Sequence, residues 1–153
     1  MTTQNNEILN EALDFLRQEG LRITQQRTVI LKYLIEKRNH PTAEMIFTDI
    51  KSECDGMSLA TVYNTLELFV KNKLVIEIAA PDEKQHFDYF AHPHYHVICT
   101  NCGKIEDVFD YSFTAIETDA AKKTGYQISH SLMEVYGLCP DCQKLLNQAA
   151  PLH

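Results

Sequence analysis

The sequence contains no long apolar run and no export signal. Nowhere do about 18 or more apolar residues follow one another, the length that a helix needs to span a bilayer. Residues 1–7 carry neither the positive segment nor the apolar segment of a secretory signal. We therefore expect a cytoplasmic protein with no membrane partner.

Basic charge is also scarce, and the formal net charge of the 153 residues is −7. Proteins that bind nucleic acid usually present a basic surface. Residues 1–84 carry ten Lys and Arg against thirteen Asp and Glu, and residues 85–153 carry four against eight, so neither half is basic. DNA binding would therefore depend on the local arrangement of side chains, or on bound cations that offset the acidic charge.

Without an export signal, the five cysteines are better interpreted as thiols or metal ligands than as disulfides. Cys99/Cys102 and Cys139/Cys142 form two Cys-x-x-Cys pairs, which favours a closed four-thiolate zinc site with a structural role. A thioredoxin-like redox pair is the alternative, but it would leave the other pair unexplained. We expect Cys54 to be a partly buried structural thiol.

The first half carries four stretches with apolar residues at helical spacing, followed by two short stretches typical of strands. Thr24, Thr42 and Ser58 stand where hydroxyl residues commonly cap helices. This order is that of a winged helix-turn-helix, with a helical bundle plus a hairpin as the alternative. The predicted helices span residues 8–18, 25–37, 43–51 and 59–72, and the predicted strands span 74–78 and 85–90.

The fourth predicted helix has two different faces. Leu59, Val62, Leu66 and Phe69 form its apolar stripe. The other face is small, polar and hydrogen-bonding near the N-terminus, which is typical of a helix that lies in the DNA major groove. That face consists of Ala60, Thr61, Tyr63, Asn64 and Glu67.

In the second half, the two cysteine pairs stand among short predicted elements. Strands are expected over residues 96–99, 104–108 and 126–135, and a helix over residues 112–123, which Thr124-Gly125 ends. The second pair, Cys139-Pro140-Asp141-Cys142, follows the last strand as a knuckle. Zinc bound by all four cysteines would therefore fasten the end of the chain to the central strands.

Histidines and aspartates gather beside the first cysteine pair. His94 and His96 alternate on a predicted strand and so face one side, with Asp88 and Asp107 within a strand or two. Imidazole and carboxylate ligands together suit Fe²⁺, Mn²⁺ or Zn²⁺. His40, in the loop before the third predicted helix, is a more distant candidate. We expect the remaining histidines, His86, His92, His130 and His153, to be ordinary surface or core residues.

The sequence resembles the ferric-uptake regulator (Fur) family over about residues 8 to 145. The motifs that carry the resemblance lie in the family's order and spacing. They are Arg22-Ile23-Thr24-Gln25-Gln26-Arg27, His40-Pro41-Thr42-Ala43, Ser58-Leu59-Ala60-Thr61-Val62-Tyr63-Asn64, His94-Tyr95-His96, Cys99-x-x-Cys102-Gly103-Lys104-Ile105 and Tyr136-Gly137-x-Cys139-x-x-Cys142.

The resemblance implies an α+β protein that is a dimeric repressor of transcription. Its expected parts are a winged helix-turn-helix DNA-binding domain over residues 1–84, a hinge over 85–91 and a small α/β dimerisation domain with a structural zinc site over 92–153. The implied partners are a second copy of the chain and a double-stranded, A·T-rich inverted-repeat operator. The implied cofactors are structural Zn²⁺ and regulatory Fe²⁺ or Mn²⁺.

The resemblance also assigns residues. The zinc ligands would be the four paired cysteines. The regulatory Fe²⁺ or Mn²⁺ ligands would be His40, Asp88, His94, His96 and Asp107. The expected DNA-contacting residues are Arg22, Arg27, Ser58, Ala60, Thr61, Tyr63 and Asn64.

Within the family, the chain is most similar to the peroxide-responsive PerR branch. Asp88 and Asp107 stand where iron sensors commonly have glutamate, and Asn64 stands where those often have arginine. The branch implies that bound Fe²⁺ reacts with peroxide and that a ligand histidine, His40 or His94, is oxidised. A sensor of iron, manganese or zinc without peroxide chemistry is the alternative. A non-haem iron enzyme is a distant one, because no substrate-binding residues are evident.

The chain departs from the pattern at a few positions. Glu67 stands where PerR relatives often carry arginine, and its carboxylate would repel phosphate. Pro93 and Tyr95 replace a His and an Asp that serve as further ligands in some members. We therefore expect no additional sensing site at these two positions.

Overall fold

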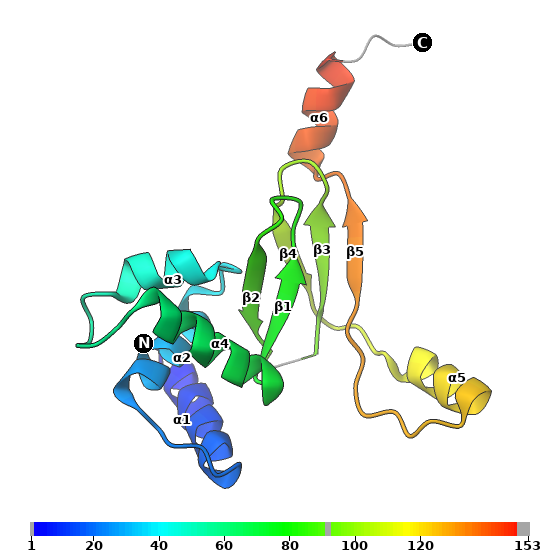
Figure 1. The fold of residues 1–153 in the computed structure, drawn as a ribbon. Helices are drawn as coiled ribbons and strands as arrows, with labels where there is room; N and C mark the ends of the chain where they lie inside the picture. Colours follow the sequence, from blue (N-terminus) through cyan, green and yellow to red (C-terminus); the bar gives the residue numbers. More distant parts are fainter. Residues whose placement is uncertain (1, 91–92, 150–153) are drawn as a thin grey trace. The chain divides into compact units, whose positions relative to one another are not determined.

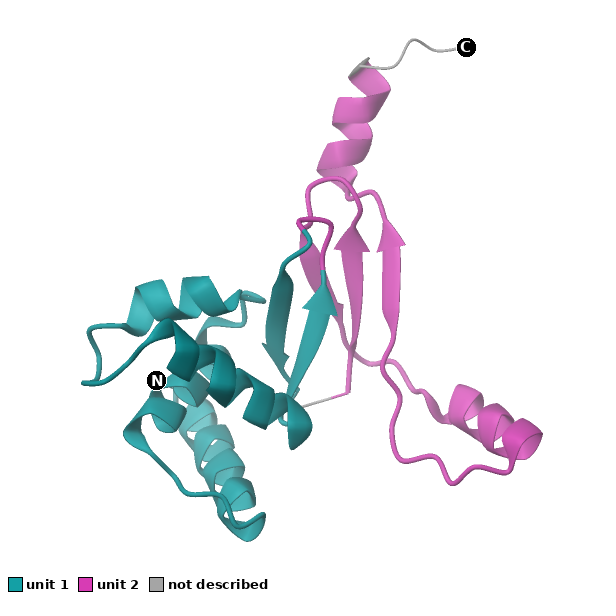
Figure 2. Ribbon diagram, viewed as in Figure 1, with its two compact units in different colours: residues 1–79, 83–91 teal, residues 80–82, 92–153 magenta. Residues whose placement is uncertain are grey.

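A computed structural model describes residues 2–90 and 93–149 of the chain (Figure 1). The chain divides into two compact units, the first formed by residues 1–79 and 83–91 and the second by residues 80–82 and 92–153 (Figure 2). Among the described residues, no helix is long and apolar enough to cross a membrane. His92 and His153, both expected to be ordinary histidines, lie outside the described residues.

The first unit contains four helices and a hairpin. Each helix begins beside a hydroxyl that accepts a hydrogen bond from the backbone N–H three residues later, over 3.1–3.2 Å. The caps predicted at Thr24, Thr42 and Ser58 are confirmed. The first helix begins earlier than predicted, because Thr2 caps it. The helices are α1 (Thr3–Gln18), α2 (Gln25–Lys37), α3 (Ala43–Ile50) and α4 (Leu59–Lys71).

The hairpin completes the first unit. Strands β1 (Val75–Ala79) and β2 (Gln85–Tyr89) pair antiparallel, from Val75 opposite Tyr89 to Ala79 opposite Gln85. One apolar core joins all four helices to this hairpin. The predicted winged helix-turn-helix is therefore confirmed. The core includes Leu13, Leu16, Ile30, Leu31, Leu34, Ile35, Ile46, Ile50, Val62, Leu66, Phe69, Val75 and Phe87.

The second unit is built on a three-stranded sheet. Strand β3 (Tyr95–Cys99) lies at its centre, antiparallel to β4 (Ile105–Val108) and parallel to β5 (Glu134–Gly137). Helix α5 (Thr114–Thr124) stands between β4 and β5 in sequence and ends at Gly125, whose φ of +74° is the left-handed conformation that glycine tolerates. Helix α6 (Pro140–Ala149) follows β5.

Two sequence predictions about the second unit need correction. A strand was predicted over residues 126–135, but residues 125–133 form no strand, and pairing with β3 begins at Glu134. The short β3 limits how much of this segment can join the sheet. Helix α6 was not predicted, although Pro140 stands at its first position, where the fixed φ of proline favours a helix start.

Apolar side chains of the second unit are unusually exposed. No described residue of α5 has a buried side chain, and every residue of β5 is exposed. Tyr126 is 73% exposed and Leu145 is 62% exposed. Exposed apolar surface of this extent is typical of a protein interface. The exposed large residues of this unit are Phe109, Tyr111, Ile116, Tyr126, Leu132, Val135, Tyr136, Leu138, Leu145 and Leu146.

The domain boundaries predicted from the sequence, including a hinge over residues 85–91, stay a prediction. Residues 85–89 form β2 of the first unit, and residue 91 lies outside the described residues.

Candidate metal centres and nucleic-acid face

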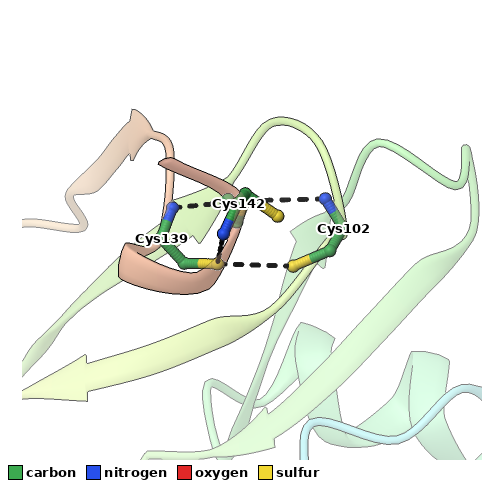
Figure 3. Close-up of side chains that lie close together, drawn as sticks. Cys102, Cys139 and Cys142 are labelled. Atoms are coloured by element: carbon green, nitrogen blue, oxygen red, sulfur yellow. Dashed lines mark hydrogen bonds between the residues drawn. The ribbon is translucent and has the colours of Figure 1, made fainter. Parts of the chain in front are cut away.

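The four paired cysteines come together in the second unit. Their sulfur atoms all lie within 4.8 Å of one another. Cys102 Sγ is 3.8 Å from Cys139 Sγ, and Figure 3 shows these two side chains together with Cys142. Sulfur atoms at the corners of a tetrahedron around Zn²⁺, each about 2.3 Å from the ion, would be about 3.8 Å apart. The cluster therefore suits a zinc ion with four thiolate ligands and no open position.

Backbone amides orient these sulfur atoms. The N–H groups of Cys102 and Cys139 donate to Cys99 Sγ over 3.5 and 3.4 Å, and Cys142 N–H donates to Cys139 Sγ over 3.4 Å. Gly103 follows the first pair at a φ of +78°, which permits the tight turn of the knuckle. The side-chain amide of Asn101 donates to Cys142 Sγ over 3.3 Å, a contact that the sequence analysis missed.

The pKa values of Cys99 and Cys142 are shifted in opposite directions. Amide hydrogen bonds from Cys139 and Cys102 lower the pKa of Cys99 to about 6. The Asn101 amide lowers the pKa of Cys142, but Cys139, burial and the other thiols outweigh it and raise that pKa to about 12. Four thiolates side by side repel one another, so a bound cation is needed to keep all four deprotonated. Zinc binding at this cluster releases protons and links metal affinity to pH.

His40 and Asp88 lie together in the first unit. His40 stands in the loop between α2 and α3, and its Nε2 is 4.0 Å from Oδ2 of Asp88 on β2. Both side chains are buried. The His40 backbone has a φ of +48°, a left-handed conformation that few residues other than glycine adopt. Its carbonyl accepts a hydrogen bond from His86 Nδ1 over 2.7 Å.

His94, His96 and Asp107 converge in the second unit. Asp107 on β4 pairs with His96 on β3, and its Oδ1 is 3.3 Å from His96 Nε2 and 3.7 Å from His94 Nε2. The two Nε2 atoms are 3.1 Å apart. Neighbouring ligands of an octahedral ion with bonds of about 2.1 Å are separated by about 3.0 Å. These three residues therefore suit Fe²⁺, Mn²⁺ or Zn²⁺.

Each unit thus brings together the expected regulatory ligands that it contains. His86 was expected to be an ordinary histidine, yet it is partly buried and bonded to the His40 loop. The available signal was its position two residues before Asp88, because alternate residues of a strand share a face. His130 is exposed and bonded to Ser129, and Cys54 is buried as expected.

Helix α4 presents the expected DNA-contacting face. Ser58, Ala60 and Asn64 are exposed and Tyr63 is 37% exposed, whereas Val62, Leu66 and Phe69 are buried. A hollow of about 280 Å³ lies beside this face. Its walls come from the N-terminal turn of α2 and from α4, where helix N-termini and polar side chains favour phosphate. The lining residues are Thr24, Gln26, Arg27, Thr61, Asn64 and Thr65.

Two hydrogen bonds fix the outer residues of this face. Arg27 Nη1 donates to the Arg22 carbonyl over 2.5 Å, and the Tyr63 hydroxyl donates to Glu44 Oε1 over 2.6 Å. This second bond lowers the pKa of the Glu44 carboxyl and raises that of the Tyr63 hydroxyl. Glu44 therefore holds the Tyr63 side chain in place from the neighbouring helix α3.

The chain is similar over most of its length to known regulators named for their response to peroxide. The chain is 43% identical over 139 residues to the peroxide operon regulator of Bacillus subtilis, covering 91% of this chain and 96% of the relative. It is 37% identical to the solved structure of the peroxide-sensing regulator PerR from Streptococcus pyogenes, with a TM-score of 0.53, covering 88% and 92% of the two chains. The solved Campylobacter jejuni peroxide stress regulator is 34% identical, with a TM-score of 0.67 and coverage of 85% and 98%.

A family model provides the broader assignment. The model of the "Ferric uptake regulator family" matches residues 18–136, which include α2 to α4, both strand pairs and most of the candidate ligands. The curated relatives are regulators rather than enzymes. The expected family resemblance and the expected absence of enzymatic function are therefore confirmed. The chain belongs to the ferric uptake regulator family.

Proposed function

We propose that this protein is a metal-dependent repressor of transcription that senses peroxide. One observation carries this proposal. His94, His96 and Asp107 direct two imidazole nitrogens and a carboxylate oxygen toward one point, in a chain that also presents an exposed, capped recognition helix. The similarity to regulators named for their response to peroxide supports the same function.

A single Fe²⁺ or Mn²⁺ ion takes ligands from both units in this proposal. His40 and Asp88 belong to the first unit, and His94, His96 and Asp107 belong to the second. An ion held by all five fixes the DNA-binding unit relative to the rest of the chain. In a dimer it thereby sets the distance between two recognition helices, which must match the spacing of the operator half-sites. Metal affinity and DNA affinity are then linked reciprocally.

The proposal also specifies the DNA site and the oligomeric state. We infer that two copies bind an A·T-rich inverted repeat in the cytoplasm, and that the exposed apolar residues of the second unit form the interface between the copies. Tyr136 on β5 and Leu132 before it are among the most exposed of these residues. Sedimentation of the zinc-loaded protein tests the assembly, and a monomeric species at micromolar concentration would exclude it.

Peroxide removes the metal site by oxidising one of its ligands. Fe²⁺ held by these ligands would supply the redox chemistry, whereas Mn²⁺ would not readily do so. In the overall balance, one molecule of hydrogen peroxide and one ring C–H of His40 or His94 would give a ring C–OH and one molecule of water, with no net gain or loss of electrons by the iron. The oxidised ring binds the metal less well, and the repressor leaves its operator.

Operator binding in a metal titration tests the ligand set. We expect His40→Ala and Asp88→Ala each to weaken Mn²⁺-dependent operator binding by at least about tenfold, because each removes a direct ligand. The zinc content and the folded dimer should be unchanged. His130→Ala is the matched control, because it removes an exposed histidine outside the proposed set. Operator affinity equal to that of the unmodified protein in both ligand variants would exclude the model.

Mass spectrometry tests the chemistry. Treatment of the Fe²⁺-loaded protein with peroxide should add one oxygen to the peptide that contains His40 or to the peptide that contains His94. The Mn²⁺-loaded protein should stay intact. If the histidines remain unmodified while the zinc cysteines are oxidised, the alternative of a metal-availability sensor without peroxide chemistry is favoured instead.

A further inference from the structure

The loop that carries His40 is fastened to strand β2 by two consecutive carbonyl groups. The His40 carbonyl accepts a hydrogen bond from His86 Nδ1 over 2.7 Å, and the Pro41 carbonyl accepts one from Phe87 N–H over 2.9 Å. The second bond joins two backbone groups and does not depend on the identity of residue 87. The first depends on a histidine side chain. The hydrogen bond from His86 is therefore the one of these two that a side-chain substitution can remove.

His40 needs such an attachment because its backbone conformation is unfavourable. A φ of +48° is unfavourable for a residue with a side chain relative to ordinary helical or extended backbone, because Cβ comes too close to the following carbonyl oxygen. Pro41 follows directly and further restricts the conformations open to His40. Without a bond to its carbonyl, the His40 backbone would be less well held in the conformation that buries the imidazole.

Residues of strand β2 lie beside both the backbone and the imidazole of His40. His86 and Asp88 are alternate residues of β2 and so share a face of it. His86 contacts the His40 backbone, while Asp88 Oδ2 lies 4.0 Å from the His40 imidazole. One short strand therefore holds the His40 backbone and places a carboxylate near its ring.

We propose that His86 is a positioning residue for the regulatory metal centre. Its Nδ1–H holds the His40 loop in the left-handed conformation from which the imidazole reaches the metal, and so raises metal affinity without contacting the ion. This inference rests on the proposed function, because it matters only if His40 binds the regulatory ion. Groups that orient a metal ligand commonly change metal affinity by about 10- to 100-fold.

Three variants of the zinc-loaded full chain test the proposal by calorimetric titration with Mn²⁺. His86→Leu removes the donor, and we expect it to weaken Mn²⁺ binding by about tenfold. His86→Asn keeps an N–H donor near the place of Nδ1, and it should restore most of the affinity. Gln85→Leu is the matched control, because Gln85 lies on the other face of the same strand and is exposed. It should bind Mn²⁺ as the unmodified protein does.

Hydrogen exchange without Mn²⁺ gives a second readout. Since Phe87 N–H donates to the Pro41 carbonyl, its exchange should be faster in His86→Leu and nearly unchanged in His86→Asn and Gln85→Leu. Equal loss of Mn²⁺ affinity in His86→Leu and His86→Asn, or unchanged exchange in His86→Leu, would overturn the positioning role.

A parallel titration of His40→Ala separates the two proposals. If His40→Ala weakens Mn²⁺ binding and His86→Leu does not, only the role of His86 is excluded. If His40→Ala itself binds Mn²⁺ normally, the proposed ligand set fails and the role of His86 fails with it.

Discussion

The two units of this chain differ in what holds each of them together. The first unit has one apolar core to which all four helices and the hairpin contribute. In the described part of the second unit, the buried apolar side chains are few, and two of them are the zinc-site cysteines Cys99 and Cys142. Its helix α5 buries no residue at all. A unit with so little core of its own requires metal or a partner chain to be stable.

This difference assigns separate tasks to the two units. The first can keep the shape of the recognition helix whatever metal is present, because apolar burial maintains it. The second depends on thiolates, zinc and an exposed apolar surface, which are features that metal loading and assembly can change. Regulation by metal then acts on the arrangement of a DNA-binding unit that is already folded. The difference predicts which variants damage one unit and leave the other intact.

The largest effect should come from removing a zinc ligand. Cys99→Ser replaces the thiolate that receives two amide hydrogen bonds, and we expect loss of zinc and unfolding of the second unit. The first unit should stay folded. Zinc content by atomic emission, together with hydrogen exchange resolved by segment, measures both outcomes. Cys54→Ala is the control, because Cys54 is a thiol outside the cluster. Equal protection of β3 in the Cys99→Ser protein would contradict the proposed dependence on zinc.

A substitution in the core of the first unit should destabilise that unit and leave the second unit intact. Phe69 on α4 is fully buried in the core of the first unit, and Phe69→Ala should lower the free energy of unfolding of that unit by about 3–5 kcal/mol. Zinc content should be normal. Chemical denaturation followed by segment-resolved exchange distinguishes the units. The distinction between them would be lost if this variant also released zinc.

Local spacing made much of the molecule predictable. Thr24, Thr42 and Ser58 act within one turn of their own helices, so their capping could be read without knowledge of the fold. The cysteine pairs were equally evident, because two cysteines separated by two residues can bind one ion whatever surrounds them. His94 and His96 share a side for the simple reason that strand residues alternate.

The remaining features depend on partners distant in sequence. The extent of β5 is set by the length of β3, so residues 126–133 look like a strand but lie outside the sheet. His86 gains its role only when β2 meets the His40 loop, 46 residues earlier in the chain. The Tyr63–Glu44 hydrogen bond likewise requires α3 and α4 to be packed together. None of these pairings has a local signal strong enough to specify it.

A smaller effect is expected at the start of the recognition helix. Ser58 Oγ accepts a hydrogen bond from Thr61 N–H, and Ser58→Ala should lower the free energy of unfolding of the first unit by about 1 kcal/mol. Because the cap also orders the first turn of α4, operator affinity should fall more than global stability alone explains. Ser58→Asn, which can cap equally well, is the matched control for stability. Identical stability of the Ala and Asn variants would show that the cap contributes nothing.

The smallest effect concerns the exposed pair formed by Glu44 and Tyr63. The Tyr63 hydrogen bond lowers the pKa of the Glu44 carboxyl, so its contribution to stability is present above the ordinary pKa of glutamate and is lost as the pH falls through the lowered value. The pKa of Tyr63 is raised, so at the alkaline end the contribution is lost as the pH rises through that raised value. Because both side chains are exposed, the pair should contribute about 0.5 kcal/mol or less near neutral pH. A double-mutant cycle of Glu44→Gln and Tyr63→Phe, repeated across the pH range, measures this coupling. A coupling energy that persisted at pH values where Glu44 is protonated would show that packing, rather than the charged hydrogen bond, joins α3 to the recognition helix.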